Sequence, residues 1–159
     1  MPVVDEKVLR DAVHEHMRAE SERDMDALRA QLHHDVDYLI RTPAHPEDPT
    51  PHGHFVGSET YISMWERLYT IFDPYAIEVL DLFVDPAQGR AFIQLQITAT
   101  PLAPWRGLPA GEPVRWWPSA VCVFDEDGHM LSETVFGSFP PTMDGYERAL
   151  AYNAEQADR

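Results

Sequence analysis

The stretch AVHEHMRAESERDMDALRAQLHHDVDYLIR, residues 12–41, decides how this chain folds. Leu9, Val13 and Met17 recur at the spacing of one helical face, which predicts a helix over residues 5–21. Charged residues fill most of the other positions, so one side of this helix packs on a core and the other faces water. The stretch therefore opens with an amphipathic helix.

A charged joint and a change of period follow that helix. Asp24 can cap a second helix, which we expect over residues 25–34. Tyr38 and Ile40 then share one face of an alternating segment, which predicts a strand over residues 35–41. The stretch thus consists of two helices and a strand.

A proline-rich loop over residues 43–53 comes next, and its four prolines predict a stiff lid or rim beside a pocket. Ser58 is a candidate cap for a third helix, which we expect to end at Asp73-Pro74. Residues 140–159 form the C-terminal tail, and residues 146–159 of it have a helical composition that is typical of a terminal helix or a frayed end.

The second half of the chain is rich in strand patterns, separated by turn residues typical of hairpins. Pro118 predicts an edge or a bulge within one of them. Helices that precede a run of antiparallel strands indicate the α+β class, with the sheet curled round the helices. The expected strands are a short one at 54–56 and longer ones at 75–84, 90–100, 114–124 and 129–139.

Length and charge exclude several classes of protein. The chain has 159 residues, enough for a single domain over 1–159. Its 12 basic and 27 acidic residues give a net charge of −15, which repels nucleic acid and anionic lipid. The single cysteine, Cys122, excludes an internal disulfide framework. With no signal-like start and no apolar span, we expect a cytoplasmic protein without membrane or nucleic-acid partners.

Known cofactor motifs are missing from the sequence. No glycine-rich nucleotide loop and no nucleophile elbow occur. His52-Gly53-His54 with Glu59 has the spacing of a cupin metal site, but Glu59 follows a helix start instead of lying on a strand. We therefore expect neither a metal nor a cofactor.

The order of these segments resembles the nuclear-transport-factor-2-like superfamily, which includes SnoaL-like polyketide cyclases and ketosteroid isomerase. Residues 12–41 match the opening of that family, and Gly57 matches the glycine before its third helix. The loop at 107–111 and the hairpin at 124–128 match two later family features, so the resemblance spans residues 8–139. It implies a cystatin-like α+β barrel, in which a cone-shaped, strongly curved, mostly antiparallel sheet wraps three helices around a deep apolar pocket.

The resemblance also shows departures from the known enzymes. His16 falls where ketosteroid isomerase has its oxyanion-holding tyrosine, and Thr42 falls near its general base. Ala120 takes the place of the protonated aspartate, so both carboxylates of that mechanism are missing. SnoaL-like enzymes have an acidic residue late in the last strand, where this chain has Glu133 a few residues earlier.

Four residues are the candidate catalytic groups. His16 can act as base or acid with Glu20 one turn on to orient it, or be a satisfied core histidine. Glu133 either enters the pocket with a raised pKa or lies on an edge strand in water. Tyr38 either binds a substrate oxygen or is a plain core aromatic residue.

Six further residues are candidates for binding substrate. The aromatic ones are also typical of a core or a dimer contact, and His54 is also typical of a solvated surface. The six are Trp65, Tyr69, Trp116, Ser119, Thr42 and His54.

The sequence thus predicts a small cofactor-independent acid–base enzyme, a cyclase, dehydratase or isomerase, acting on a hydrophobic aromatic or polyketide-like molecule. We expect it to form a homodimer. Two alternatives stay open: a non-catalytic subunit, such as the small subunit of an aromatic-ring dioxygenase, and a small-molecule-binding protein of the same fold.

Overall fold

The computed structural model describes residues 4–41, 53–105 and 107–137. Thr42, most of the proline-rich loop and the tail at 140–159 lie outside the described residues, and so does the predicted lid. The elements are α1 (Glu6–Glu22), α2 (Met25–Gln31), β1 (Leu32–Arg41), β2 (His54–Val56), α3 (Ser58–Tyr69), β3 (Phe72–Asp85), β4 (Arg90–Pro101), β5 (Val114–Trp116), β6 (Ser119–Phe124) and β7 (Met130–Phe136).

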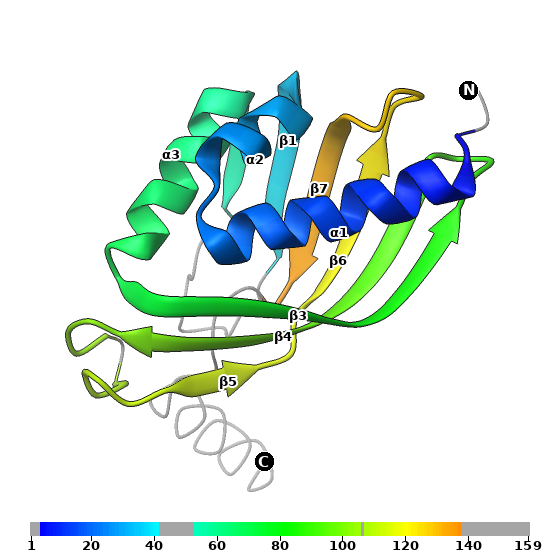
Figure 1. Ribbon diagram of the computed structural model, residues 1–159. Helices are drawn as coiled ribbons and strands as arrows, with labels where there is room; N and C mark the ends of the chain where they lie inside the picture. The colour runs from blue at the N-terminus through cyan, green and yellow to red at the C-terminus, as the bar shows by residue number, and fades with distance from the viewer. Residues whose placement is uncertain (1–3, 42–52, 106, 138–159) are drawn as a thin grey trace, which may run out of the picture.

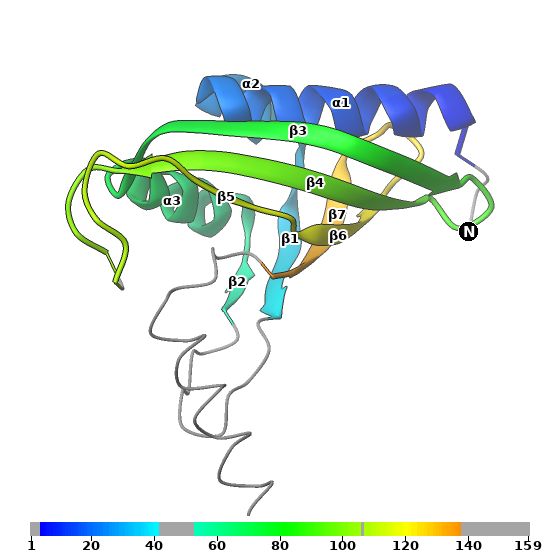
Figure 2. The same ribbon diagram turned by 90° about the horizontal axis from the view of Figure 1, so that it is seen from below.

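The strands form one curved sheet of seven, in the order β2-β1-β7-β6-β4-β3, with β5 paired to β4 (Figure 1). β1 and β7 run parallel, and the other neighbours run antiparallel. The helices pack inside the curve: α1 lies along β3, and α3 faces β1 (Figure 2). This confirms the predicted α+β cone. Within the described residues the sheet does not close into a barrel, because its end strands, β2 and β3, do not pair.

Local signals in the sequence explain most of the helix ends. The Asp5 side chain accepts hydrogen bonds from the first turn of α1. Arg23 ends α1 in the left-handed conformation, and Asp24 caps α2 by accepting from the Ala27 N–H, as predicted. The predicted cap at Ser58 is wrong: Gly57, with φ 92°, occupies the cap position and no side chain caps α3.

Several predicted boundaries are also wrong. The second helix is shorter than predicted, ending at Gln31, and β1 already begins at Leu32. The third helix ends at Tyr69 and not at Asp73-Pro74. The strand predicted over 114–124 is two strands, separated around Pro118, which has no N–H to donate to a sheet ladder.

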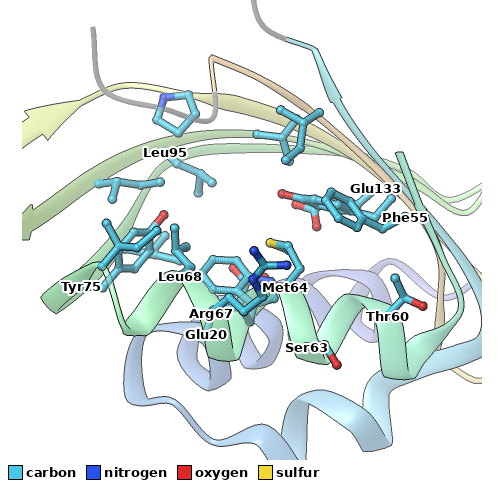
Figure 3. A pocket seen from close by; sticks show the side chains of 18 residues that line it. Glu20, Phe55, Thr60, Ser63, Met64, Arg67, Leu68, Tyr75, Leu95 and Glu133 are labelled. Carbon is cyan, nitrogen blue, oxygen red and sulfur yellow. The ribbon is translucent and has the colours of Figure 1, made fainter. Parts of the chain in front are cut away.

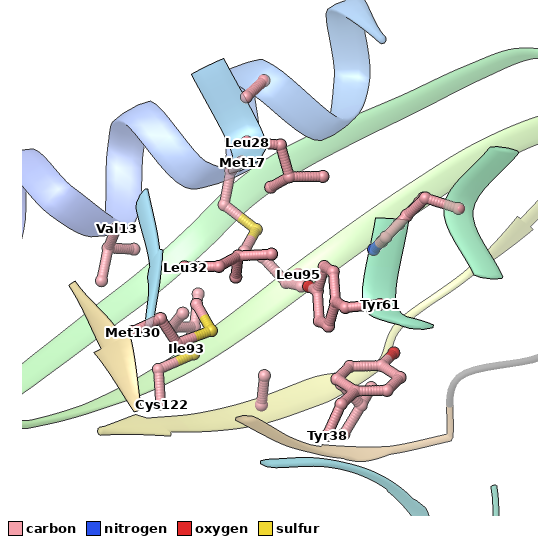
Figure 4. Close-up of a cluster of buried hydrophobic side chains, with 14 of the residues drawn as sticks. Val13, Met17, Leu28, Leu32, Tyr38, Tyr61, Ile93, Leu95, Cys122 and Met130 are labelled. Atoms are coloured by element: carbon pink, nitrogen blue, oxygen red, sulfur yellow. The ribbon is translucent and has the colours of Figure 1, made fainter. Parts of the chain in front are cut away.

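The core fills the space between α1, α2 and the concave face of the sheet. On β4, every second residue from Ala91 to Ala99 is buried, as the alternation predicts. Figure 4 shows Val13 and Met17 from α1 approaching Ile93 in this space. No helix in the described ranges is long and apolar enough to cross a membrane.

Candidate active site

Four polar side chains meet inside the protein, and we call them the buried polar cluster: His16 and Glu20 from α1, Tyr61 from α3, and Glu133 from β7. None is more than 3% exposed. The Tyr61 hydroxyl lies 3.0 Å from His16 Nε2, 2.7 Å from Glu20 Oε1 and 2.8 Å from Glu133 Oε2. His16 Nε2 also lies 3.0 Å from Glu20 Oε1 and 3.9 Å from Glu133 Oε2.

Helix and strand periodicity bring these groups together. His16 and Glu20 are four residues apart on the inner face of α1, so both side chains reach the same space. Glu133 shares the inward face of β7 with Val135, as the alternation predicts. Because β7 lies between β1 and β6, Glu133 is in the middle of the sheet and not on an edge strand.

The hydrogen-bond pattern of the cluster depends on where its few protons lie. Tyr61 has one hydroxyl proton but lies within hydrogen-bond distance of two carboxyl oxygens. When Tyr61 donates to Glu20, Glu133 can hydrogen-bond to the phenol oxygen only as a neutral carboxyl group that donates its own proton. When the His16 Nε2–H donates to Glu20 instead, the Tyr61 hydroxyl can donate to an ionised Glu133. The geometry therefore gives Glu133 a hydrogen-bond partner in both of its protonation states.

The electrostatics decide between these two states of Glu133. Burial is the largest influence on Glu133 and the Glu20 charge adds to it, so its pKa rises to about 7 although His16 and the Tyr61 hydrogen bond oppose the rise. Burial lowers the pKa of His16, but the Glu20 and Glu133 carboxylates outweigh it and the net pKa is raised. Burial and the same two carboxylates raise the pKa of Tyr61, which stays protonated.

A pocket of about 390 Å³ lies beside the cluster, between α3 and the sheet (Figure 3). Glu20 and Glu133 reach its wall, whereas His16 and Tyr61 lie behind the wall. Most of the remaining wall is apolar. It consists of Tyr38, Ile40, Phe55, Met64, Trp65, Leu68, Ile71, Tyr75, Ile77, Leu95, Ile97, Pro118 and Val135, with Thr60, Ser63 and Arg67 as polar additions.

Two predicted residues join the carboxylates in this wall. The Tyr38 ring meets the Tyr61 ring edge to face, with centroids 4.8 Å apart. Trp65 is 5% exposed, and its indole N–H has no hydrogen-bond partner among the described residues. A buried donor without a partner costs free energy, so a ligand oxygen that reaches Trp65 Nε1 would gain a hydrogen bond there.

The other predicted binding residues that are described do not line the pocket. The Tyr69 hydroxyl donates to the backbone oxygen of Glu20 and so helps to hold α1. Trp116 is buried, packed against the rings of Phe72 and Tyr75, and Ser119 lies on β6 outside the wall. His54 is exposed, with its Nε2 2.6 Å from Asp37 Oδ1.

Sequence reasoning missed Tyr61, which hydrogen-bonds to every other member of the cluster. Its position in α3 matches an apolar stripe, so it was indistinguishable from a core aromatic residue. The hydroxyl group of Tyr61 was the only signal on that stripe, and Tyr69 carries the same signal about two helical turns later. The partners of Tyr61 are 41 to 72 residues away in sequence, so only the fold reveals them.

The cluster also has the composition of a metal site. Ligand atoms of His16, Glu20 and Glu133 lie within 4.8 Å of one another. The Tyr61 hydroxyl, however, already hydrogen-bonds to all three groups. The arrangement is thus explained by hydrogen bonds alone. A second group, His33, His34 and Asp35, consists of consecutive residues near the start of β1, of which His34 and Asp35 are exposed.

The curved α+β sheet wrapped around helices and an apolar pocket is the cone-shaped nuclear-transport-factor-2-like fold. Within this fold class, the chain belongs to the SnoaL-like domain family, whose sequence profile matches residues 13–133. This confirms the resemblance seen in the sequence. No curated protein matches the chain significantly.

Solved structures share this fold at low sequence identity. The epoxide hydrolase/cyclase-like enzyme SalBIII, with a role in pyran ring formation in the polyether salinomycin, superposes with a TM-score of 0.66 at 20% identity, covering 83% of this chain and 92% of its own. IdmH from Streptomyces antibioticus, proposed as a polyketide cyclase, superposes with a TM-score of 0.64 at 18% identity, covering 80% of this chain and 89% of its own. A Kribbella flavida protein proposed as a ketosteroid isomerase superposes with a TM-score of 0.61 at 17% identity, covering 84% of this chain and 79% of its own. These similarities establish the fold.

Proposed function

We propose that this protein is a small acid–base enzyme, a cyclase, dehydratase or isomerase, that moves a proton next to a carbonyl group of a hydrophobic aromatic or polyketide-like molecule. One observation carries the proposal: Glu133, with a pKa of about 7, lies in the wall of an apolar pocket. A carboxyl group with such a pKa can accept and return a proton near neutral pH. The cyclase-like structural relatives are consistent with this chemistry.

In this mechanism Glu133 is the group that meets the substrate. The ionised Glu133 takes a proton from the carbon next to the carbonyl and becomes a neutral acid, while the carbonyl oxygen gains the negative charge. The Trp65 indole N–H and the Tyr38 hydroxyl are the proposed donors to that oxygen, since both residues line the pocket. Glu133 then returns the proton to the product. His16, behind the wall, is a positioning residue that acts through Glu20 and Glu133.

The pH dependence of activity tests the role of Glu133. Because the base must be ionised, we expect kcat/KM to rise with pH through about 7 and then level off. The measurement is exchange of the α-protons of β-tetralone, an aromatic ketone, followed by proton NMR in deuterium oxide. A rate that falls with pH across the same interval would contradict a general base.

Replacing Tyr61 by phenylalanine tests the link within the cluster. The Tyr61 hydrogen bond lowers the pKa of Glu133, so Tyr61→Phe should shift the pH–rate inflection upward. At pH 7 the exchange rate should fall about tenfold, the order expected for losing a hydrogen bond to a charged group. Tyr69→Phe, on the same helix but bonded to the Glu20 backbone, is the matched control and should leave the inflection in place. Equal profiles for both variants would exclude this link.

The exchange assay is also the test of the function as a whole. Catalysed exchange with wild-type protein, absent in Glu133→Gln, supports an acid–base enzyme. Tight binding of aromatic ketones without any exchange or conversion would favour the small-molecule-binding protein instead.

The outer face of the sheet supports the proposed homodimer. Phe83 and Phe92 are cross-strand partners on β3 and β4, and they are 61% and 43% exposed. Adjacent exposed aromatic residues form an apolar patch, and patches of this kind occur at protein–protein contacts. For a homodimer, light scattering after gel filtration should give a mass twice the 18.2 kDa of one chain. If the protein is recovered only in complex with a larger chain, the alternative of a non-catalytic subunit is favoured.

A further inference from the structure

The pocket wall contains one cationic side chain, Arg67, and among the described residues it makes no ion pair. Arginines elsewhere on the helices are paired with carboxylates: Arg10, Arg18, Arg23 and Arg29. With 27 acidic residues against 12 basic ones, carboxylate partners are plentiful in this chain. An exposed arginine that lines the pocket without such a partner is available to a ligand.

The wall is therefore polar at two separate places. Glu133 is hydrogen-bonded to Tyr61, and Arg67 follows Tyr61 by six residues on the same helix, which is a rise of roughly 9 Å. The wall residues between them on α3 include the apolar Met64 and Trp65. Figure 3 shows the Arg67 guanidinium beside Met64, turned toward the space between α3 and the sheet, and the Glu133 carboxyl entering that space from the opposite side.

We propose that Arg67 binds a carboxylate at one end of an elongated apolar substrate, so that the carbonyl at the other end lies against Glu133. This inference rests on the proposed function, because it assumes that Glu133 meets the substrate. The planar guanidinium can donate two parallel hydrogen bonds to a carboxylate. In the reverse orientation the anion would face Glu20 and Glu133, and like charges repel. The charge pattern thus sets the direction in which the substrate enters.

Two ligands of equal shape test the inference. Naphthylacetate carries a carboxylate, and naphthylacetamide carries a neutral amide in its place. Their affinities are measured by calorimetry near pH 6 and at low salt, for wild type, Arg67→Gln and Arg67→Lys. Arg90→Gln is the control, since Arg90 is exposed at the start of β4, outside the pocket wall, and makes no ion pair with a described residue.

We expect wild type to prefer the carboxylate by about threefold to tenfold, the range of a partly exposed ion pair with two hydrogen bonds. Arg67→Gln should abolish the preference, Arg67→Lys should retain part of it, and Arg90→Gln should leave it unchanged. Equal affinities in wild type, no binding of either ligand, or a preference that survives in Arg67→Gln would overturn the inference. If the wild type catalyses β-tetralone exchange but shows no preference for the carboxylate, only the role of Arg67 is rejected. If the wild type shows a clear preference but no exchange, only the catalytic proposal is rejected.

Discussion

Glu133→Gln should reduce the exchange rate by ~10²–10⁴, the usual effect of removing a general base, and should at the same time stabilise the folded protein at pH 8. Glutamine has the shape of the protonated carboxyl and can donate to the Tyr61 oxygen as that form does. It cannot take a proton. The same substitution therefore keeps the hydrogen bonds of the cluster and removes its proposed chemistry.

The gain in stability follows from the raised pKa of Glu133. The folded state holds the proton more tightly than the unfolded state, so the contribution of Glu133 is full below about 4.5 and is lost as the pH rises through about 7. A rise in pKa from 4.5 to about 7 corresponds to about 3 kcal/mol. Glutamine carries no such dependence. As the pH rises from 4.5 to 8, the free energy of unfolding of Glu133→Gln minus that of wild type should therefore increase by about 3 kcal/mol.

Urea unfolding across this pH range, for both proteins, measures the difference. Glu78→Gln is the matched control, because Glu78 is exposed on β3 and its substitution should change neither activity nor the pH dependence. A constant difference between wild type and Glu133→Gln at every pH would show that Glu133 titrates normally. An active Glu133→Gln would remove Glu133 from the mechanism.

A residue that weakens the fold at neutral pH is typical of a functional site. A buried apolar residue at position 133 would avoid the cost of a carboxyl with a raised pKa. Sequence periodicity could reveal this much, because Glu133 interrupts the inward face of a strand and His16 and Glu20 interrupt the apolar face of a helix. In each place a charged side chain occupies a position where the pattern requires an apolar one.

Periodicity could not reveal which of these polar residues face the pocket. His16 and Glu20 share one helical face, yet Glu20 reaches the wall and His16 lies behind it. The difference depends on the tertiary packing that brings Tyr61 of α3 into hydrogen-bond contact with both His16 and Glu20. The sequence could not indicate Arg67 for a similar reason. An exposed arginine on a helix is common, and only the fold shows that this one lines a pocket. Aromatic character alone could not separate pocket from core residues, because Tyr69 and Trp116 are buried in the core.

The histidine gives the second large effect. His16→Gln should destabilise the protein by about 3–5 kcal/mol near pH 6, because it leaves the buried Glu20 carboxylate without its cation. The pKa of His16 is raised in the folded state, so its stabilising contribution is full below 6.5 and is lost as the pH rises through the raised value. The deficit of His16→Gln against wild type should therefore shrink in alkaline solution. Urea unfolding near pH 6 and pH 9 measures both values.

His14→Gln is the control for this variant, because His14 lies on the same helix two residues earlier with its side chain exposed. A second measurement separates positioning from stability alone. The His16 charge lowers the pKa of Glu133, so in His16→Gln the inflection of the exchange rate should move above pH 7. If His16 only fills space, the variant loses stability but keeps the wild-type inflection. An upward shift in the folded variant would mean that His16, although it does not touch the pocket, helps to set the pH at which Glu133 is ionised.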